Sequence, residues 1–264
     1  MESGFELPES FGASPRYPLD SVDNALRLLS LFRTHNRIRV KDAAEALEVA
    51  TGTAHRLLAM LVYRGYITQD PVTRVYTPGV MLLSIGLQAA QRSDLRTAAA
   101  PYLDALRDEL DETITVASLE GVEVLFIDAR ESTKTLRVTS RAGTLRLAHC
   151  TSVGKALLAE LPRDALLELY GEEKLPQATA SSIATRSQLL VELEPTRARG
   201  YAVNFGELEE GIGSVGVAVR DSSGRARAAL GAGAPMIRLD DLRIKEMARV
   251  IMDAASRLGN DLSS

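Results

Sequence analysis

Apolar residues recur every three or four positions through the first part of the chain and predict three consecutive helices. The first begins at Ser21 and ends near His35, the second runs from Lys41 to about Val49, and the third from Gly52 to Arg64. Their apolar stripes are Val22, Ala25, Leu26, Leu29 and Phe32, then Ala43, Ala44 and Leu47, then Ala54, Leu57, Leu58 and Leu61. The tight turn between the second and third helices, and the polar outer face of the third, indicate a helix-turn-helix.

A short hairpin is predicted directly after the third helix. The β-favouring runs YITQD and RVYTP flank a turn signal that begins with Asp70 and Pro71. With this hairpin as a wing, residues 21–79 are predicted to form a winged helix-turn-helix domain that binds DNA. A small helical cluster with an ordinary hairpin is the alternative that the local pattern leaves open.

Helical spacing continues from Pro78 to about Asp111. Residues 80–94 are predicted to form a linker helix that lies too far from either core to be buried within one chain. Its apolar strip consists of Met81, Leu82, Ile85 and Ala89. Such a strip usually pairs with a partner, so we expect a homo-oligomer. Pro101 is expected to kink or break the following helix.

The remainder of the chain is predicted to contain groups of strands with helices at their flanks. The predicted strands are TITVASLEG, VEVLFIDAR, TLRVTSRAG, GIGSVGVAVRD and RARAALGAGAP. The predicted helices are SVGKALLAELP, PRDALLELY, RSQLLVELEPTRARG up to a stop at Gly200, and Asp240 to Leu258. Grouped strands with helices beside them predict an α+β domain built on an antiparallel sheet over residues 95–264.

Charge is distributed unevenly between these regions. The whole chain of 264 residues carries a net charge of −4, which by itself does not indicate a nucleic-acid partner. Residues 21–90, however, hold eight Arg and Lys against five Asp and Glu. A basic module on an acidic body is the asymmetry expected of a DNA-binding head on a regulatory domain. Residues 1–20 are acidic and rich in Gly, Pro and Ser, and are expected to form a mobile tail.

Composition narrows the class further. Hydrophobic residues make up 45% of the chain and charged residues 25%, values typical of globular domains with real cores. The apolar runs are too short to span a bilayer, and the N-terminus lacks a signal pattern, so no membrane partner is expected. The single cysteine, Cys150, excludes an intramolecular disulfide. A cytoplasmic location is therefore expected.

Five segments in this order resemble the IclR family of bacterial transcriptional regulators. They are SVDNALRLL, TAHRLLAMLVYRGYITQD, HCTSVGKALLAELP, RARGYAVNFGELEEGIGSVGVAVRD and ALGAGAP. The resemblance extends from Ser21 to the last helix. It implies a dimer or tetramer with an N-terminal winged helix-turn-helix, a linker helix and a GAF-like C-terminal domain that binds a small metabolite. A dimer would place two heads on a pseudo-palindromic operator.

Eight residues are candidates for contact with DNA. Arg56 is the expected base reader, because its planar guanidinium pairs bidentately with guanine. His55 and Thr53 are expected at a base edge or a phosphate, and Thr51 at a phosphate near the helix start. The remaining candidates are Arg74 on the wing, in the minor groove or on the backbone, and Arg37, Arg39 and Lys41 on nearby phosphates. For Arg37 and Arg39 a solvated loop is the alternative.

A ligand site is expected where residues 149–155, HCTSVGK, lead into a helix. Free N–H groups at the helix start would suit a carboxylate, which makes Ser152, Val153 and Gly154 candidates. The resemblance implies that the effector also contacts the two strands that contain Ser214, Gly231 and Gly233, and the position of Asn204. Relatives that bind small oxo-acids carry hydroxyls where this chain has Gly231 and Gly233, and an acidic residue at Asn204.

Two interpretations of these glycines remain open from the sequence. In the first, the missing hydroxyls leave space for a bulkier effector, such as an aromatic or extended acid. In the second, the glycines flatten a strand so that neighbouring elements can pack closely against it.

Other motifs do not indicate catalysis. GIGSVG at 211–216 fits the dinucleotide pattern, but an acidic segment precedes it and strand-like residues follow it. His149 and Cys150 are sequence neighbours that point in different directions, and the three histidines are too scattered to form a zinc site with the cysteine. The acidic run 207–210 is interpreted as a solvated turn. No catalytic residue, metal or cofactor is expected.

We therefore expect a metabolite-responsive transcription factor and not an enzyme. The competing class is an α+β enzyme acting on a small carboxylate, with the N-terminal helices as a structural appendage. A third class is an architectural DNA-binding protein without a ligand. Sequence-specific DNA binding, and its response to small acids, would separate the three.

Overall fold

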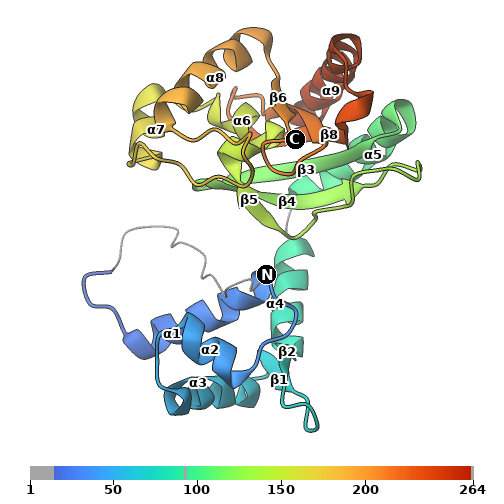
Figure 1. The fold of residues 1–264 in the computed structure, drawn as a ribbon. Coiled ribbons are helices and arrows are strands. Elements are labelled where there is room, and N and C mark those ends of the chain that lie inside the picture. The colour runs from blue at the N-terminus through green and yellow to red at the C-terminus, as the bar shows by residue number, and fades with distance from the viewer. Residues whose placement is uncertain (1–14, 92–93, 263–264) are drawn as a thin grey trace. The chain divides into compact units, whose positions relative to one another are not determined.

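The computed structural model describes residues 15–91 and 94–262 (Figure 1). The chain divides into two compact units, residues 1–92 and 93–264. Residues 1–14 of the predicted tail lie outside the described residues. Helix α1 (Asp20–Ser30) begins one residue inside the segment that was assigned to the tail.

The N-terminal unit is a winged helix-turn-helix. After α1 and the 3-10 helix η1 (Leu31–Arg33) come α2 (Val40–Ala46) and α3 (Thr51–Tyr63), then strands β1 (Ile67–Gln69) and β2 (Tyr76–Pro78), and finally α4 (Val80–Gln91). The two strands form an antiparallel hairpin. Its core is a single cluster that includes Leu28, Leu31, Ala43, Leu47, Ala54, Leu58, Leu61, Ile67 and Tyr76.

The apolar stripe predicted for the first helix was right only in part: Leu29 and Phe32 pack against the core, but two other members of the stripe do not. Leu28 and Leu31 are fully buried, whereas Val22 and Leu26 are exposed. Apolar residues cover more than one face of this helix, so periodicity alone does not decide which face packs against α3. The α-helix also ends at Ser30 and continues as the 3-10 turn η1, earlier than the end predicted near His35.

The predicted linker region contains two helices. Helix α4 ends at Gln91, and α5 (Asp94–Leu110) follows. On α4 the side chains of Met81 and Ile85 are exposed, as the predicted strip requires, while the side chain of Ala89 lies outside the described residues. Helix α5 continues past Pro101 without a break. Its buried residues Ala99, Leu103, Leu106 and Leu110 pack against the sheet and hold the helix together on both sides of the proline.

The C-terminal unit is built on a six-stranded antiparallel sheet in the order β5-β4-β3-β8-β7-β6. The strands are β3 (Thr113–Glu120), β4 (Glu123–Arg130), β5 (Leu145–Leu147), β6 (Ala202–Phe205), β7 (Ile212–Arg220) and β8 (Ala226–Pro235). Each neighbouring pair is antiparallel. Strand β6 was not predicted from the sequence.

The strand predicted over TLRVTSRAG, residues 135–143, was wrong. This segment forms a loop, and the next strand begins only at Leu145. Side chains hold most of this loop in place: Thr113 donates to the carbonyl of Val138 at 2.6 Å, and the N–H of Ser140 donates to Glu131 at 2.9 Å. At its end the loop also bonds to the backbone of a strand, where the N–H of Gly143 donates to the carbonyl of Phe126 on β4 at 2.7 Å. A period-2 pattern does not reveal that such side-chain bonds will replace a ladder.

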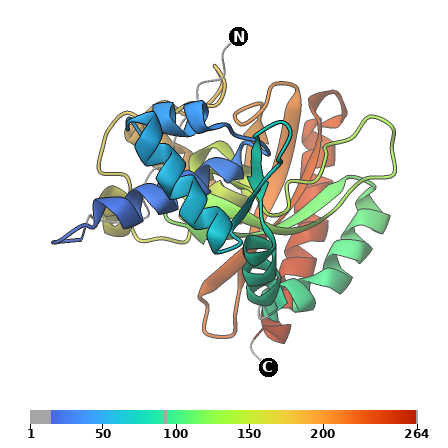
Figure 2. The same cartoon turned by 90° about the horizontal axis from the view of Figure 1, so that it is seen from below.

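Helices cover both faces of the sheet (Figures 1 and 2). Helix α5 and the final helix α9 (Asp241–Asp261) pack on one face over a core of Val, Ile, Leu and Ala residues. The 3-10 helix η2 (Ala148–Cys150) leads into α6 (Ser152–Leu158), which packs on the other face with α7 (Arg163–Leu169) and α8 (Arg186–Arg199). Helix α8 stops at Gly200, whose φ of 81° is left-handed. The predicted α+β class is confirmed.

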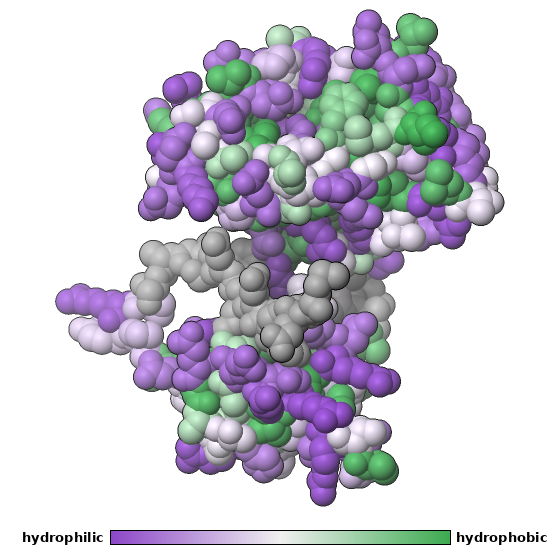
Figure 3. Space-filling model, in the orientation of Figure 1, coloured by the Kyte–Doolittle hydropathy of each residue, from purple (hydrophilic) through white to green (hydrophobic). Residues whose placement is uncertain are grey.

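The surface shown in Figure 3 mixes hydrophilic residues with separate hydrophobic ones. Exposed large apolar side chains on α4 include Val80, Met81, Leu83 and Ile85. Over the described ranges, the helices lack the combination of length and apolar character that crossing a membrane requires.

Candidate functional site

The outer face of α3 presents the residues predicted to read DNA. Ala54, Leu58 and Leu61 point into the core, so the opposite face is turned to solvent. Thr51, His55 and Arg56 are exposed on that face, and Thr53 is half-buried. The guanidinium of Arg56 donates to the hydroxyl of Thr53 at 3.4 Å, which places it over the first turn of the helix.

Basic side chains lie beside the wing. A single β-bridge joins Ile38 to Tyr76 of β2, with N–H to O distances of 3.1 and 2.8 Å. Ile38 is buried, so the flanking Arg37 and Arg39 are exposed next to the hairpin. Lys41 is exposed in the first turn of α2. The bridge brings these residues to the edge of the hairpin, a placement that their sequence position alone does not reveal.

The turn of the wing is held rigidly by Asp70. Its Oδ1 accepts hydrogen bonds from the N–H groups of Val72 at 2.9 Å and Thr73 at 2.7 Å. The bonds to Thr73 and Val72 lower the pKa of this carboxyl below its ordinary value. Arg74 follows with a φ of 58°, a left-handed conformation that a non-glycine residue adopts at a cost. Its exposed side chain projects from the turn.

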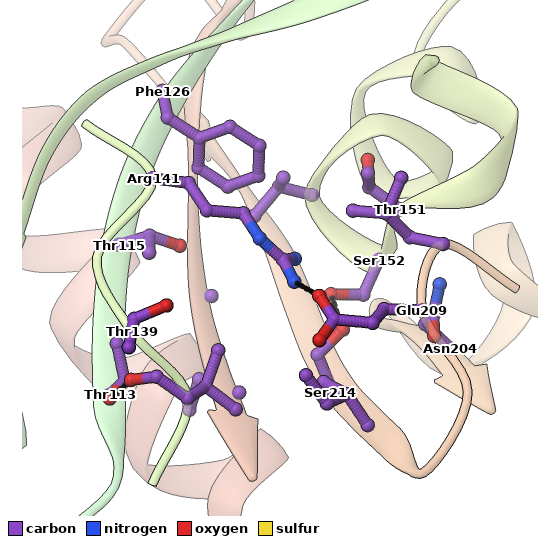
Figure 4. Close-up of a pocket in the computed structure, with 17 residues that line it drawn as sticks. Thr113, Thr115, Phe126, Thr139, Arg141, Thr151, Ser152, Asn204, Glu209 and Ser214 are labelled. Atoms are coloured by element: carbon purple, nitrogen blue, oxygen red, sulfur yellow. Dashed lines mark hydrogen bonds and ion pairs between the residues drawn. The ribbon is translucent and has the colours of Figure 1, made fainter. Parts of the chain in front are cut away.

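The C-terminal unit contains a cavity of about 40 Å³ between the start of α6, the sheet and two loops (Figure 4). That is room for a few water-sized groups. Six of the seven predicted effector residues line it: Ser152, Val153, Asn204, Ser214, Gly231 and Gly233. The other lining residues, which were not predicted, are Thr113, Thr115, Phe126, Val138, Thr139, Arg141, Thr151, Leu208, Glu209, Ile212 and Ala232.

Among the described residues, Gly154 is the one predicted effector residue that does not line the cavity. Its N–H donates to the hydroxyl of Thr151, the N-cap of α6, at 2.9 Å. A Cβ at this position would lie 2.1 Å from the carbonyl oxygen of Ala148. Gly154 therefore allows α6 to pack on the turn before it, and its N–H is already used by the cap.

The N–H groups of Ser152 and Val153 make no hydrogen bond within the described residues. The first turn of α6 packs very closely on β7, because a Cβ added at Gly216 would lie only 2.4 Å from the carbonyl carbon of Ser152. The hydroxyls of Ser152 and Ser214 are hydrogen-bonded at 2.8 Å. The amide of Asn204 donates to the carbonyl of Cys150 at 2.5 Å, so its side chain also fixes the approach to the helix.

The two glycines of β8 differ in their surroundings. A Cβ on Gly231 would lie 2.6 Å from Cγ1 of Val153, so this glycine allows α6 to approach the strand closely. At Gly233 the nearest atom to an added Cβ is Cγ1 of Val138, at 3.7 Å. Close packing therefore explains Gly231, whereas at Gly233 a methyl group would fit in ordinary van der Waals contact with Val138.

An ion pair lies at the edge of the cavity. The guanidinium of Arg141 and the carboxylate of Glu209 point toward each other, with Nη2 and Oε2 2.5 Å apart (Figure 4). Arg141 lies in the segment that was wrongly predicted as a strand, and Glu209 in the acidic run of residues 207–210. No sequence signal links the two residues, which are 68 positions apart.

The acidic run 207–210 is only in part the solvated turn that the sequence indicated, because Glu209 and Glu210 are exposed but Glu207 is not. The carboxylate of Glu207 is turned inward and lies 2.7 Å from the ammonium of the fully buried Lys155. Burial raises the pKa of the Glu207 carboxyl, and the charge of Lys155 opposes that shift. Alternating acidic residues in a short loop do not show which carboxylate will be buried.

A thiol nucleophile does not fit the surroundings of Cys150. Burial raises the pKa of its thiol, the opposite of what an active thiolate requires. The neighbouring His149 is also buried, which lowers its pKa, and its Nε2 lies 2.8 Å from the carbonyl oxygen of Pro176. In the described residues, His, Cys, Asp and Glu form no cluster that could hold a metal ion.

Two family models match the chain. The model described as IclR helix-turn-helix domain covers residues 21–71, and the model described as Bacterial transcriptional regulator IclR C-terminal covers residues 87–260. A relative, the HTH-type transcriptional regulator BhcR of Paracoccus denitrificans, is 30% identical over 247 residues. The match covers 94% of this chain and 88% of the relative.

Solved structures share the fold. An IclR transcriptional regulator from Alicyclobacillus acidocaldarius matches with a TM-score of 0.79 at 23% identity, over 94% of this chain and 100% of that one. An IclR homologue from Microbacterium hydrocarbonoxydans, crystallised in complex with 4-hydroxybenzoate, matches with a TM-score of 0.75 at 22% identity. That match covers 92% of this chain and 98% of the homologue.

A winged helix-turn-helix unit followed by a cavity-bearing antiparallel-sheet unit defines a transcriptional regulator with a DNA-binding and an effector domain. The chain belongs to the IclR family of bacterial transcriptional regulators. The resemblance noted in the sequence is thereby confirmed. The family's members are regulators, which also confirms the expectation that this chain is not an enzyme.

Proposed function

We propose that this regulator binds a pseudo-palindromic operator sequence-specifically, and that a small carboxylate in the C-terminal cavity changes its affinity for that operator. The observation that carries the proposal is the cavity itself. Polar groups from α6 and β7 meet an apolar wall in a chain that also carries an exposed basic helix and wing.

On the DNA side, we place α3 in the major groove. Arg56 then reads a base, and His55 and Thr53 reach a base edge or a phosphate. Thr51 contacts a phosphate near the helix start, and Arg74 on the wing enters the minor groove or contacts the backbone. Arg37, Arg39 and Lys41 neutralise phosphates beside the wing; their exposure next to the hairpin supports this role.

On the ligand side, the N–H groups of Ser152 and Val153 would take a carboxylate oxygen. Ser214 and Asn204 would complete the polar edge, and the strand at Gly231 and Gly233 would form the floor. The absence of a side chain at Gly233 leaves room for about one methyl group beside Val138, which favours a ligand with some bulk. The homologue that was crystallised with 4-hydroxybenzoate makes aromatic monocarboxylates the first class to test.

We also propose that the protein acts as a dimer or tetramer. The exposed apolar side chains of α4, among them Met81, Leu83 and Ile85, would pair with a second copy. Two winged heads related by a two-fold axis would then read the two halves of an operator. A ligand can alter this binding only if its affinity differs between the conformations that do and do not fit the operator.

Fluorescence anisotropy on DNA from upstream of the protein's own gene tests the proposal. Measurements at two salt concentrations, with and without a panel of carboxylic acids, should show salt-dependent binding that at least one acid alters. A scrambled duplex of equal length is the control. Specific binding that no acid alters would indicate an architectural protein without an effector, and equal binding to the scrambled duplex would overturn the proposal of sequence-specific recognition.

A further inference from the structure

The edge of the cavity carries charges of both signs. Among the described residues that line the cavity, Arg141 is the one cation and Glu209 the one anion. The remaining lining residues are apolar or carry neutral hydroxyl or amide groups. An arginine next to a cavity of this kind presents a planar fork that matches a carboxylate.

The two side chains of this ion pair differ in their exposure to solvent. The side chain of Arg141 is only 18% exposed, whereas that of Glu209 is 59% exposed. The side chain of Arg141 is therefore largely enclosed by the protein, whereas that of Glu209 lies on the solvent side of the pair. Figure 4 shows the two side chains pointing toward each other.

The loop that carries Glu209 has its own anchors. Gly206 and Gly211 at its two ends have left-handed φ values of 73° and 78°. The N–H of Gly206 donates to the carbonyl of Ile212 at 2.8 Å, and the N–H of Ile212 donates to the carbonyl of Glu209 at 3.2 Å. Together with the contact between Glu207 and Lys155, these backbone bonds hold the loop by interactions that do not involve the contact between Glu209 and Arg141.

We infer that Arg141 pairs with the same effector carboxylate that the start of α6 receives in the proposed function, and that Glu209 occupies Arg141 as an internal carboxylate when no ligand is bound. A monocarboxylate with an apolar body displaces Glu209, takes over the guanidinium and packs its body against Phe126 and Val138. This inference rests on the proposed function, since it assigns the charge-recognising residue of the same cavity. It makes Arg141 the residue that selects acids over their neutral analogues.

Isothermal titration with benzoate and 4-hydroxybenzoate, each beside its uncharged amide, tests the inference on the full-length protein. Glu209→Gln should bind the acids about two- to fivefold more tightly than the wild type, because the internal competitor is lost. Arg141→Gln should bind them about ten- to a hundredfold more weakly and should no longer prefer acids to amides.

A matched ion pair serves as the control. Arg257 and Asp253 are 2.9 Å apart on α9, and neither is among the described residues that line the cavity. Arg257→Gln and Asp253→Asn should leave acid binding as in the wild type.

Acid binding that Arg141→Gln leaves unchanged would overturn the inference, as would weaker binding by Glu209→Gln. The absence of acid binding by Glu209→Gln at millimolar concentration would also overturn it. Operator binding measured on the same preparations keeps this failure distinct from a failure of the proposed function.

Discussion

The ammonium nitrogen of Lys155 lies 2.7 Å from Oε1 of Glu207 in the interior of the effector domain. Lys155 is 1% exposed and Glu207 12%, and the more exposed Glu192 lies 3.5 Å from the same nitrogen. The cavity lies at the start of α6. The pair joins this helix to the loop that carries Glu209. Once buried, each charge depends on the other, because the interior cannot solvate either alone.

Removing one partner of this pair should destabilise the protein. Glu207→Ala leaves the ammonium of Lys155 with only Glu192, so we expect the free energy of unfolding to fall by about 3 kcal/mol. Urea denaturation followed by circular dichroism measures the change. Glu192→Gln, which removes the more exposed neighbour, should change stability by less than about 1 kcal/mol. Equal effects of the two substitutions would contradict the dominant role of the buried pair.

Stability should depend on the protonation of His149. Burial lowers the pKa of this imidazole below its ordinary value of 6.5, so the unfolded chain takes up a proton first as the pH falls. The stabilising contribution is therefore complete above 6.5 and is lost as the pH decreases below that value. His149→Gln keeps a donor for the carbonyl of Pro176 and should lose less stability on acidification. Urea midpoints above and below pH 6.5 measure this, and parallel losses in both proteins would contradict it.

Arg56 should determine sequence preference on DNA. Arg56→Ala removes a bidentate base contact and should weaken operator binding by about 1–3 kcal/mol while scrambled DNA is bound almost as before. Arg225, exposed at the turn between β7 and β8, offers a control that removes the same charge from the other domain. Anisotropy with both duplexes distinguishes them. If Arg56→Ala kept the site preference, the base-reading role would be wrong.

Arg74 should affect DNA affinity but not folding. The left-handed conformation of Arg74 costs about 1–2 kcal/mol, and Arg74→Gly removes this cost. Because the gain offsets the greater flexibility of glycine in the unfolded chain, the free energy of unfolding should not fall. Loss of a phosphate contact should lower the salt slope of DNA binding by about one. Arg74→Ala removes the same charge and keeps the strain, and should therefore be the less stable variant with the same slope. A salt slope equal to that of the wild type would exclude the contact.

The two glycines of β8 should respond differently to alanine. Gly231→Ala forces its Cβ to 2.6 Å from Val153 and should cost about 1–3 kcal/mol as α6 shifts. Gly233→Ala meets its nearest neighbour at 3.7 Å and should change stability by less than about 0.5 kcal/mol. Thermal unfolding measures both. A large loss in Gly233→Ala would show that the space beside it is smaller than the geometry indicates.

Local sequence patterns correctly predicted the helices and strands that depend mainly on their own residues. The stripe of α3, the hairpin after it and the strands β3, β4, β7 and β8 follow from periodicity and turn residues. The predictions were wrong where the conformation of a segment depends on residues far away in the sequence. Thr113 and Glu131 hold the segment before β5 as a loop, and the choice of face on α1 depends on what packs beside it.

The residues of the candidate cavity likewise divide into those that the sequence predicted and those that it did not. Ser152, Ser214 and the β8 glycines were expected because the resemblance and the helix start pointed to them. Arg141 and Glu209 were missed because the chain brings them together across 68 positions. Glu207 and Lys155 were missed for the same reason. Pairing of charges across such separations leaves no periodic signal, so it is seen only once the fold is known.

The small residues of β8 have a consequence for how ligand specificity can diverge. The strand runs between β3 and β7, and the part that reaches the cavity, Gly231 to Gly233, presents almost only backbone. That wall is rigid and offers few side chains to exchange. Arg141 and Glu209, by contrast, lie on two loops that also line the cavity, and loops tolerate change more readily than a sheet. New ligands can thus be accommodated by altering the loops while the sheet that supports them is kept.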